Sequence, residues 1–266
     1  MTEQLAHAIL FSAGIALLSW RARFLTPGGA LTQFILGSIL LGLGGWEWTV
    51  PMVAFFLSSS IFSHLWKNRR AEAESSFEKS SRRDAAQVVA NGGIAGVATL
   101  LWFFTHDESL FALYLGAVAA ATADTWATEL GTLSKSSPVL ITSLERVERG
   151  RSGAVSVLGI VASLAGAFLV SLTALPWVPS SQAVALVGAA TIGGVAGSLA
   201  DSLAGAVLQA QFRCMVCQRI TERKLHCGSE TRQVGGFRLI RNDQVNLICT
   251  LIGGVLGFWL LSVFLS

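Results

Sequence analysis

Long apolar segments alternate with short polar loops along almost the whole chain. Each segment approaches the length of about 20 residues that an α-helix needs to cross a bilayer. We therefore predict an all-α, polytopic membrane protein that forms a single transmembrane domain over residues 1–266. The eight expected helices cover about residues 5–20, 29–45, 48–66, 85–104, 109–130, 153–175, 182–209 and 244–265.

Composition and charge placement strengthen this prediction and add an orientation. Hydrophobic residues make up 52% of the chain and charged residues only 13%, about half the usual charged share of soluble proteins. All 19 lysines and arginines fall in the loops after the first, third, fifth and seventh expected helices. The positive-inside rule then places these loops in the cytoplasm and both termini outside, in a bacterial-type inner membrane. Basic residues dispersed in this way offer no surface to nucleic acid.

Two of the expected helices carry an aspartate, Asp124 and Asp201, near their cytoplasmic ends. A charged side chain inside the hydrocarbon costs about 2.5–3.5 kcal/mol and usually marks a function. Small residues surround Asp124, which lets neighbouring helices enclose its carboxylate. Both aspartates lie in an Ala-Asp-(Thr/Ser)-x-Ala pattern, at residues 123–127 and 200–204. The repeat favours an internal duplication, with chance recurrence in a chain rich in small residues as the alternative.

Polar side chains also gather at the expected starts of two helices. On the fourth, Gln87 and Asn91 are four residues apart and therefore share one face. The last helix opens in a similar way with Asn242, Asp243 and Asn246. We expect these residues to face a polar ligand from the cytoplasmic side. Helix capping is the alternative for Asp243, and hydrogen bonding between helices is the alternative for the deeper amides.

Residues that suit a magnesium-phosphate site lie at the end of the fifth expected helix and in the loop after it. Asp124 and Thr128 share one strip of the helix, and Glu129 lies on the adjacent strip. Carboxylates and hydroxyls are ligands for Mg²⁺, which is often bound together with substrate phosphates. For the loop cations, determination of membrane topology is the alternative. The loop offers hydroxyls, glycines and cations to a polyanion, namely Ser134, Lys135, Arg149, Gly150, Arg151, Gly153 and Ser156.

Five motifs together resemble one integral membrane family. They are Ala-Asp-Thr-Trp-Ala-Thr-Glu-Leu-Gly at 123–131 and the segments at 87–92, 138–142, 150–156 and 242–246. This set resembles the family that contains the phytyl-phosphate kinase of plants and cyanobacteria together with an animal transmembrane protein. A wider pattern around Asp124 is similar to the CTP-dependent phytol and dolichol kinases.

The resemblance implies a kinase that transfers the γ-phosphate of CTP or another nucleoside triphosphate to a phytyl or other isoprenyl monophosphate. Since a phosphate monoester has a second pKa of about 6, the attacking oxygen needs no strong base at neutral pH. On this hypothesis Asp124 and Asp201 bind Mg²⁺, and Glu129 and Lys135 assist catalysis. Residues expected to contact the nucleotide and the lipid phosphate are Arg82, Arg83, Gln87, Asn91, Thr128, Ser134, Arg149, Gly150, Arg151, Gly153, Ser156, Ser202, Asn242, Asp243 and Asn246.

Two other classes of membrane protein are alternatives. A transporter or flippase for an anionic or lipid-phosphate substrate would also use paired acids in an approximate repeat. It needs a path to the outer face, however, and the outer halves of the helices at 109–130 and 182–209 contain no acid or base. A CDP-alcohol-type phosphotransferase matches less well, because its signature has glycine after the first aspartate, where this chain has Thr125.

A separate group of potential metal ligands lies in the cytoplasmic loop at 210–241. It consists of Cys214, Cys217, His226 and Cys227. Three thiols and an imidazole suit a structural Zn²⁺ ion, and a reducing compartment argues against disulfides. We therefore predict a small zinc-binding insertion, with free loop thiols as the alternative.

Overall fold

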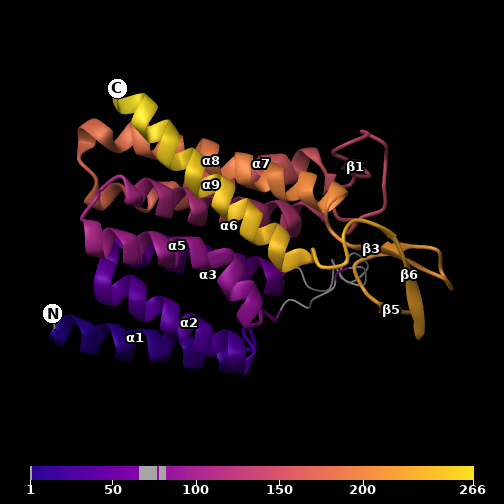
Figure 1. Cartoon of the computed structure of the whole chain (residues 1–266), viewed down its shortest axis with the longest axis horizontal. Helices are drawn as coiled ribbons and strands as arrows, with labels where there is room; N and C mark the ends of the chain where they lie inside the picture. The colour runs from indigo at the N-terminus through magenta and orange to yellow at the C-terminus, as the bar shows by residue number, and fades with distance from the viewer. Residues whose placement is uncertain (1, 66–76, 78–81) are drawn as a thin grey trace.

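The computed structural model describes residues 2–65, 77 and 82–266. Within these ranges, eight long helices lie side by side in one bundle, so the expected helical architecture is confirmed (Figure 1). A short π-helical turn at Leu40–Gly44 continues α2. The helices are α1 (Thr2–Arg21), α2 (Pro27–Ile39), α3 (Trp46–Leu65), α5 (Ala85–Thr105), α6 (Leu110–Gly131), α7 (Val157–Leu172), α8 (Ser180–Val207) and α9 (Asn242–Leu265).

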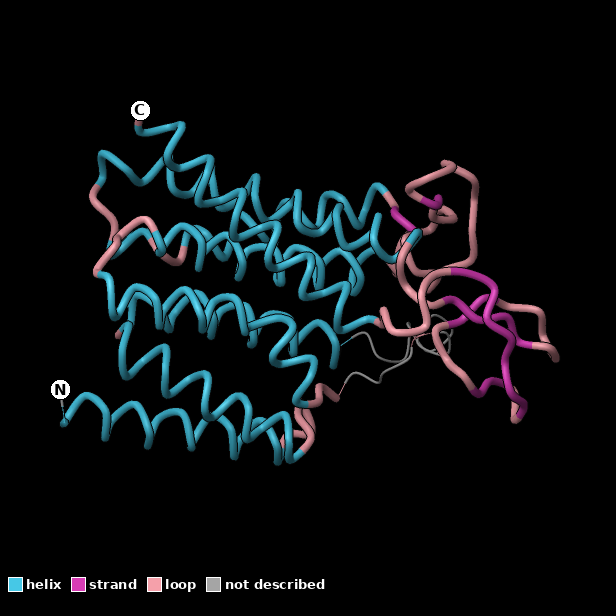
Figure 2. The backbone as a smooth tube through the Cα atoms, in the orientation of Figure 1, coloured by secondary structure: helices cyan, strands magenta, loops and turns pink. Residues whose placement is uncertain are grey.

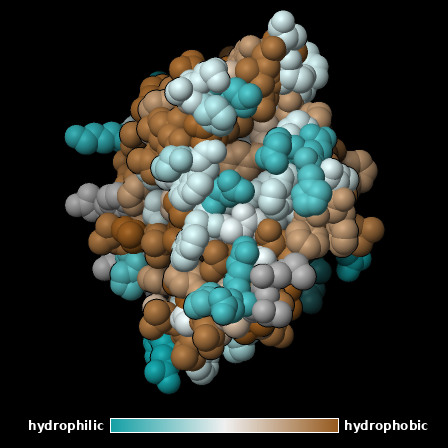
Figure 3. Space-filling view, turned by 90° about the vertical axis from the view of Figure 1, so that its left-hand side faces the viewer, coloured by the Kyte–Doolittle hydropathy of each residue, from teal (hydrophilic) through white to brown (hydrophobic). Residues whose placement is uncertain are grey.

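Seven spans among the described residues are long and apolar enough to cross a membrane, and α1 is not one of them. Large apolar side chains such as Leu164 and Phe168 are exposed along the sides of the bundle, as expected for surfaces that face lipid. Seen end-on from the side of the termini, hydrophobic side chains dominate the rim, and hydrophilic ones lie across the middle of the face (Figure 3). The chain is therefore a polytopic membrane protein.

Both termini lie at one end of the bundle, and the strands and long loops lie at the other (Figures 1 and 2). This arrangement fits the eight helices of the bundle, although only seven candidate membrane spans are found among the described residues, where eight were expected. Which end faces the cytoplasm stays a prediction of the positive-inside rule.

The expectation of an all-α fold is wrong at the loop end of the bundle. Two short strands, β1 (Val139–Leu140) and β2 (Ala154–Val155), pair antiparallel. The loop between α8 and α9 forms a four-stranded antiparallel sheet in the order β4-β3-β6-β5. These segments are short and lack helical periodicity, so backbone pairing satisfies their N–H and C=O groups instead. The four strands are β3 (Gln211–Cys214), β4 (Ile220–Thr221), β5 (Leu225–His226) and β6 (Ser229–Gly235).

The central helix is α6, which is the most buried of the seven candidate spans and contacts α3, α5, α7, α8 and α9. Small residues allow this packing, because they let helix backbones approach closely. A Cβ atom at Gly253 of α9 would lie 2.4 Å from the Cβ of Ala120 in α6. A Cβ at Gly193 of α8 would lie 2.6 Å from the carbonyl oxygen of Gly253. Glycine is thus required where α6, α8 and α9 meet.

Gly253→Val is expected to lower the free energy of unfolding by about 1–3 kcal/mol, the usual cost of overpacking a tight core. Gly14→Val is the matched control, because a Cβ at Gly14 would meet nothing within 4 Å. Titration of the detergent-solubilised variants with a denaturing detergent measures the difference. Equal loss of stability in both variants would show that the three-helix contact is looser than the structure describes.

Candidate functional site

A polar cavity of about 250 Å³ lies where the ends of the helices meet the loops, on the side of the strands. Its walls come from the ends of α3, α6 and α8, the starts of α5 and α9, and the turn before α7. Segments far apart in the sequence are therefore brought to one place. The cavity gathers most of the residues expected to form a phosphate site.

Asp124 of α6 and Asp201 of α8 enter this cavity at the same level. One turn earlier in each helix, Ala120 and Gly197 touch, since a Cβ at Gly197 would lie 2.7 Å from the Cβ of Ala120. A step of four residues along each helix then brings the two aspartates onto facing sides. Asp201 is close enough to Asp124 and Glu222 for their negative charges to repel. Its buried Oδ2 atom has no hydrogen-bond partner among the described residues.

A turn with two glycines, residues 150–153, forms another part of the cavity wall. Gly150 has φ +84° and Gly153 has φ +79°, a conformation that favours glycine. At Gly153 a Cβ would also lie 2.5 Å from the Cβ of Ala206 in α8. The pairing of β1 with β2 closes the base of the loop that carries this turn. The turn places Arg151 at the cavity, and its buried Nε has no hydrogen-bond partner in the described part of the chain.

A second cation, Arg83, lies between the cavity and the aromatic side chains of α3. Its guanidinium carbon is 5.5 Å from the centre of the Phe55 ring and 5.7 Å from that of Phe56. Burial lowers the pKa of Arg83 to about 10, while the negative charge of Glu129 opposes this shift. Arg83 therefore stays charged at neutral pH. Glu129 itself accepts a hydrogen bond from the Ser63 hydroxyl.

The amide side chains at the helix starts also reach the cavity. Asp84 caps α5, with its carboxylate accepting from the Gln87 backbone N–H at 3.0 Å, and the Gln87 side chain accepts from the Asp84 N–H at 3.1 Å. Asn91 donates to the Gln87 carbonyl at 3.0 Å, within the same helix. Gln87 and Asn91 line the cavity from α5, and Asn242 and Asn246 line it from α9.

The cavity lining includes fifteen of the residues expected to form the site, and four others lie elsewhere. Arg82 donates from Nε to the Leu25 carbonyl at 2.8 Å. Ser134 contacts the Ser136 hydroxyl. Lys135 is exposed, and Asp243 lies in the first turn of α9. The fifteen are Arg83, Gln87, Asn91, Asp124, Thr128, Glu129, Arg149, Gly150, Arg151, Gly153, Ser156, Asp201, Ser202, Asn242 and Asn246.

Glu222 is a cavity residue that the sequence prediction missed. It lies between β4 and β5, and its carboxylate accepts a hydrogen bond from the Ser152 hydroxyl at 2.7 Å. Its carbonyl oxygen accepts from Nη2 of Arg241 at 3.0 Å. Only folding of the sheet brings it to the membrane helices. The available signal was its place as the single acid between Cys217 and His226.

An apolar groove of about 90 Å³ adjoins the polar cavity. Side chains of α1, α2, α3 and α5 line it, and Arg83, Gln87 and Asn91 belong to both linings. Along α3 the groove reaches from Leu57 to Thr49, about 12 Å at 1.5 Å per residue. A molecule with a charged head and an apolar tail fits this combination.

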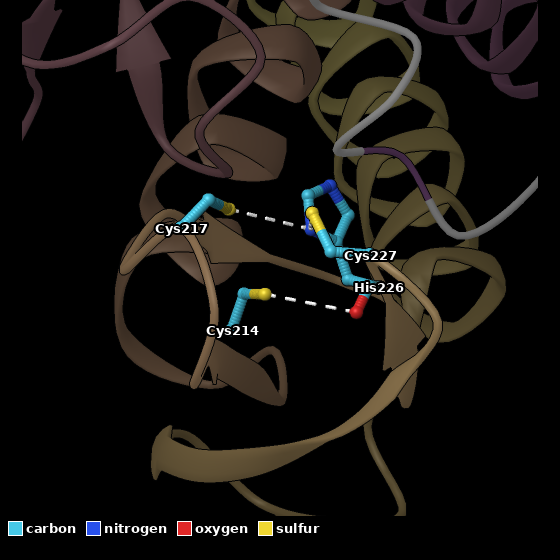
Figure 4. Close-up of side chains that lie close together, drawn as sticks. All are labelled: Cys214, Cys217, His226 and Cys227. Carbon is cyan, nitrogen blue, oxygen red and sulfur yellow. Dashed lines mark hydrogen bonds between the residues drawn. The ribbon is translucent and has the colours of Figure 1, made fainter.

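The four predicted zinc ligands lie together on the sheet, outside the cavity lining (Figure 4). Hydrogen bonding from the Cys217 backbone is the main cause that lowers the pKa of Cys214 to about 6. Hydrogen bonding with Cys217 is likewise the main cause that raises the pKa of Cys227 to about 11. These hydrogen bonds favour the thiolate form of Cys214 over that of Cys227.

The lipid-facing bundle and the polar cavity near one end define a polytopic helical membrane protein with a polar cavity where the helix ends meet the loops. The sequence model of the family described as "Integral membrane protein DUF92" matches residues 10–254, and the chain belongs to this family.

Relatives of this chain occur in archaea, plants and cyanobacteria. An uncharacterized membrane protein of Methanocaldococcus jannaschii is 32% identical over 250 residues, which cover 94% of this chain and 91% of that protein. Protein PGR of Arabidopsis thaliana is 28% identical over 272 residues, or 94% and 93% of the two chains. An uncharacterized membrane protein of Synechocystis sp. is 30% identical over 146 residues, or 54% and 57%. No solved structure matches the chain.

Proposed function

We propose that the protein is a membrane kinase that transfers the γ-phosphate of a nucleoside triphosphate to an isoprenyl monophosphate. The observation that carries this proposal is that the polar cavity and the apolar groove adjoin each other. A cavity with acids and cations shares Arg83, Gln87 and Asn91 with an apolar groove. A lipid phosphate would place its head in the first space and its tail in the second.

The donor set of the cavity fits a Mg²⁺ ion. Asp124, Asp201 and Glu222 are acids close enough for their charges to repel when they are ionised, and the Asp201 Oδ2 atom lacks a protein partner among the described residues. A divalent cation relieves such repulsion, and carboxylate oxygens are its preferred ligands. Asp124 and Asp201 would hold the ion, with Ser202 beside them. When bound, it neutralises charge on the transferred phosphate.

The cations of the cavity would hold and orient the two phosphate-bearing substrates. Arg151 is fixed by the turn at 150–153, and its Nε is free of protein partners in the described residues. Arg83 is held against Phe55 and Phe56. A lipid phosphate oxygen attacks the γ-phosphorus, a new P–O bond forms, and the bond to the β-phosphate oxygen breaks to release the nucleoside diphosphate. The attacking oxygen is already deprotonated, so positioning and charge supply the catalysis.

The opposite end of the bundle supports an enzyme over a transporter. Trp48, Trp102, Phe111 and Tyr114 form an aromatic cluster there, with ring centroids of contacting pairs 4.9–5.6 Å apart. Trp48 and Tyr114 are almost fully buried. The packed rings offer a charged substrate few polar groups to follow toward that face, and the Tyr114 hydroxyl already donates to the Trp48 carbonyl. Phosphate chemistry on one side of the membrane needs no such path.

An assay of the detergent-solubilised protein tests the proposal. Mg²⁺, a panel of nucleoside triphosphates and phytyl, geranylgeranyl and longer polyprenyl monophosphates are combined, and lipid diphosphate is measured. We expect product with at least one pair, which would also identify the donor and the chain length. A folded preparation that makes no diphosphate across the panel contradicts the proposal, and flux measurements in liposomes would then test transport.

Val53→Trp is expected to shift the preferred acceptor toward shorter chains, because Val53 lines the apolar groove and a larger side chain fills it. The efficiency kcat/KM for the longest good acceptor should fall about 10- to 100-fold, as expected for a hydrophobic pocket that loses several methylene contacts. Val97→Trp is the matched control, since Val97 is exposed on α5. Equal chain-length profiles in the two variants would place the tail elsewhere.

A further inference from the structure

The geometry points to a structural zinc site formed by Cys214, Cys217, His226 and Cys227. Their ligand atoms all lie within 4.8 Å of one another. The His226 Nδ1 is 3.5 Å from the Cys217 sulfur and 3.2 Å from the Cys227 sulfur. A tetrahedron with Zn–S of about 2.3 Å and Zn–N of about 2.0 Å has edges of roughly 3.5–3.8 Å, so small side-chain rotations complete it.

The backbone shape already directs the ligands toward one point. Cys214 ends β3, and the turn that follows brings Cys217 back, with the Gln218 N–H donating to the Cys214 carbonyl at 3.0 Å. The Val216 N–H donates to the Cys214 sulfur at 3.4 Å, which stabilises a thiolate. Cys227 has φ +52°. Figure 4 shows the sulfurs of Cys214 and Cys217 directed toward His226 from the other side of the loop.

The ligand set selects zinc among the common metals. Three sulfurs and one imidazole nitrogen form one of the usual tetrahedral structural zinc sets. Magnesium and calcium prefer oxygen ligands, and iron–sulfur clusters are commonly held by four cysteines. Since all four positions are protein side chains, the site is closed and has a structural role.

The sheet also needs a cross-link of this kind. Strands β4 and β5 each have two residues, and strands this short are marginal by themselves. Apolar side chains near the cluster, Met215, Val216 and Leu225, are exposed rather than gathered in a core. Metal binding supplies the stability that a small domain lacks. Here the ion would join the end of β3 to the end of β5.

The zinc site would also position a cavity residue. Glu222 lies in the segment between Cys217 and His226, and its carboxylate reaches the Ser152 hydroxyl at the cavity. A metal that fixes both ends of this segment holds Glu222 in place. It thereby connects the sheet to the membrane site without contacting any substrate.

Metal analysis of the full-length protein, purified in detergent under reducing conditions with one equivalent of zinc and then dialysed, tests the site. We expect about one zinc ion per chain, the content of a single structural site. Cys217→Ser and Cys227→Ser should each weaken zinc binding about tenfold or more, since even an outer-shell change costs that much. Cys249→Ser is the matched control, because Cys249 is buried in α9 far along the chain from the cluster.

Cobalt substitution gives a readout that depends on no variant. Co²⁺ in the wild-type protein should show the visible absorption of a tetrahedral ion with thiolate ligands. Absence of this absorption, an unchanged zinc affinity in both serine variants as measured by competition with a chelator, or a Cys217–Cys227 disulfide in the reduced preparation would overturn the site. None of these measurements uses lipid phosphorylation, so they stand apart from the proposed kinase activity.

Discussion

Asp124→Asn and Asp201→Asn are each expected to lower lipid-phosphate phosphorylation by about 100-fold or more while the protein stays folded. Removing a single preorganised electrostatic group from an active site commonly costs about 10²–10³ in rate, and here the lost charge also holds Mg²⁺. Asparagine keeps the shape of the side chain. Because Asp201 is repelled by Asp124 and Glu222, the unfolding midpoint should be unchanged or higher in either variant.

Asp107→Asn is the control for this pair. Asp107 lies in the loop before α6, at the other end of the bundle, where its side chain accepts hydrogen bonds from Ser109. The substitution is the same, but the residue is outside the cavity lining. Full activity in Asp124→Asn, or equal loss in Asp107→Asn, would exclude the aspartate pair from the mechanism.

Gly153→Ala is expected to be the most damaging single-methyl change in the cavity wall. The φ of +79° costs alanine about 1–2 kcal/mol. The new Cβ would also meet Ala206 at 2.5 Å, with the Ala206 backbone N at 2.7 Å, and relief of such a clash costs about 1–3 kcal/mol more. The turn must move away from α8 and carry Arg151 with it. A displacement of about 1 Å can cost about 100-fold in turnover.

Gly45→Ala separates the cost of the positive φ from the cost of the clash with α8. Gly45 has φ +77°, and the new methyl group would have only the Gln4 amide nitrogen nearby, at 4.0 Å. The variant should therefore lose only the free energy of unfolding that the positive φ costs alanine, and it should keep full activity. Denaturation and kinetic assays on both variants make the comparison. If Gly153→Ala loses no more stability than Gly45→Ala and turns over normally, the contact between the turn and α8 does not control the site.

The helices and much of the cavity were predictable because both rest on local patterns. Apolar length predicted the helices, although α1 is not among the seven candidate spans, and an acid inside such a span stood out by its energetic cost, as with Asp124 and Asp201. The glycines of the turn were expected in a phosphate site, and the structure adds why they must be glycine. Gly153 both adopts a positive φ and touches α8.

The remaining features depend on contacts between segments far apart in the sequence. The sheet arises from pairing of polar loop segments with no strong strand pattern. Glu222 reaches the cavity only through that sheet, and the apolar groove exists only because four helices leave space between them. Lys135 looked equivalent to Arg151, but it is exposed, and its carbonyl accepts a hydrogen bond from Arg149 at 3.3 Å. No local sequence pattern distinguishes an exposed cation such as Lys135 from a cavity residue such as Arg151.

The most direct test of the account follows the phosphate itself. Purified protein receives a nucleoside triphosphate labelled at the γ-phosphate, Mg²⁺ and unlabelled phytyl monophosphate, with the Asp124→Asn variant in parallel. The account predicts that label appears in the lipid diphosphate, in equal amount to the nucleoside diphosphate released, and that the variant transfers almost none. Label that stays in the triphosphate or appears only as inorganic phosphate, in a folded preparation tested with every donor and acceptor of the panel, would contradict it.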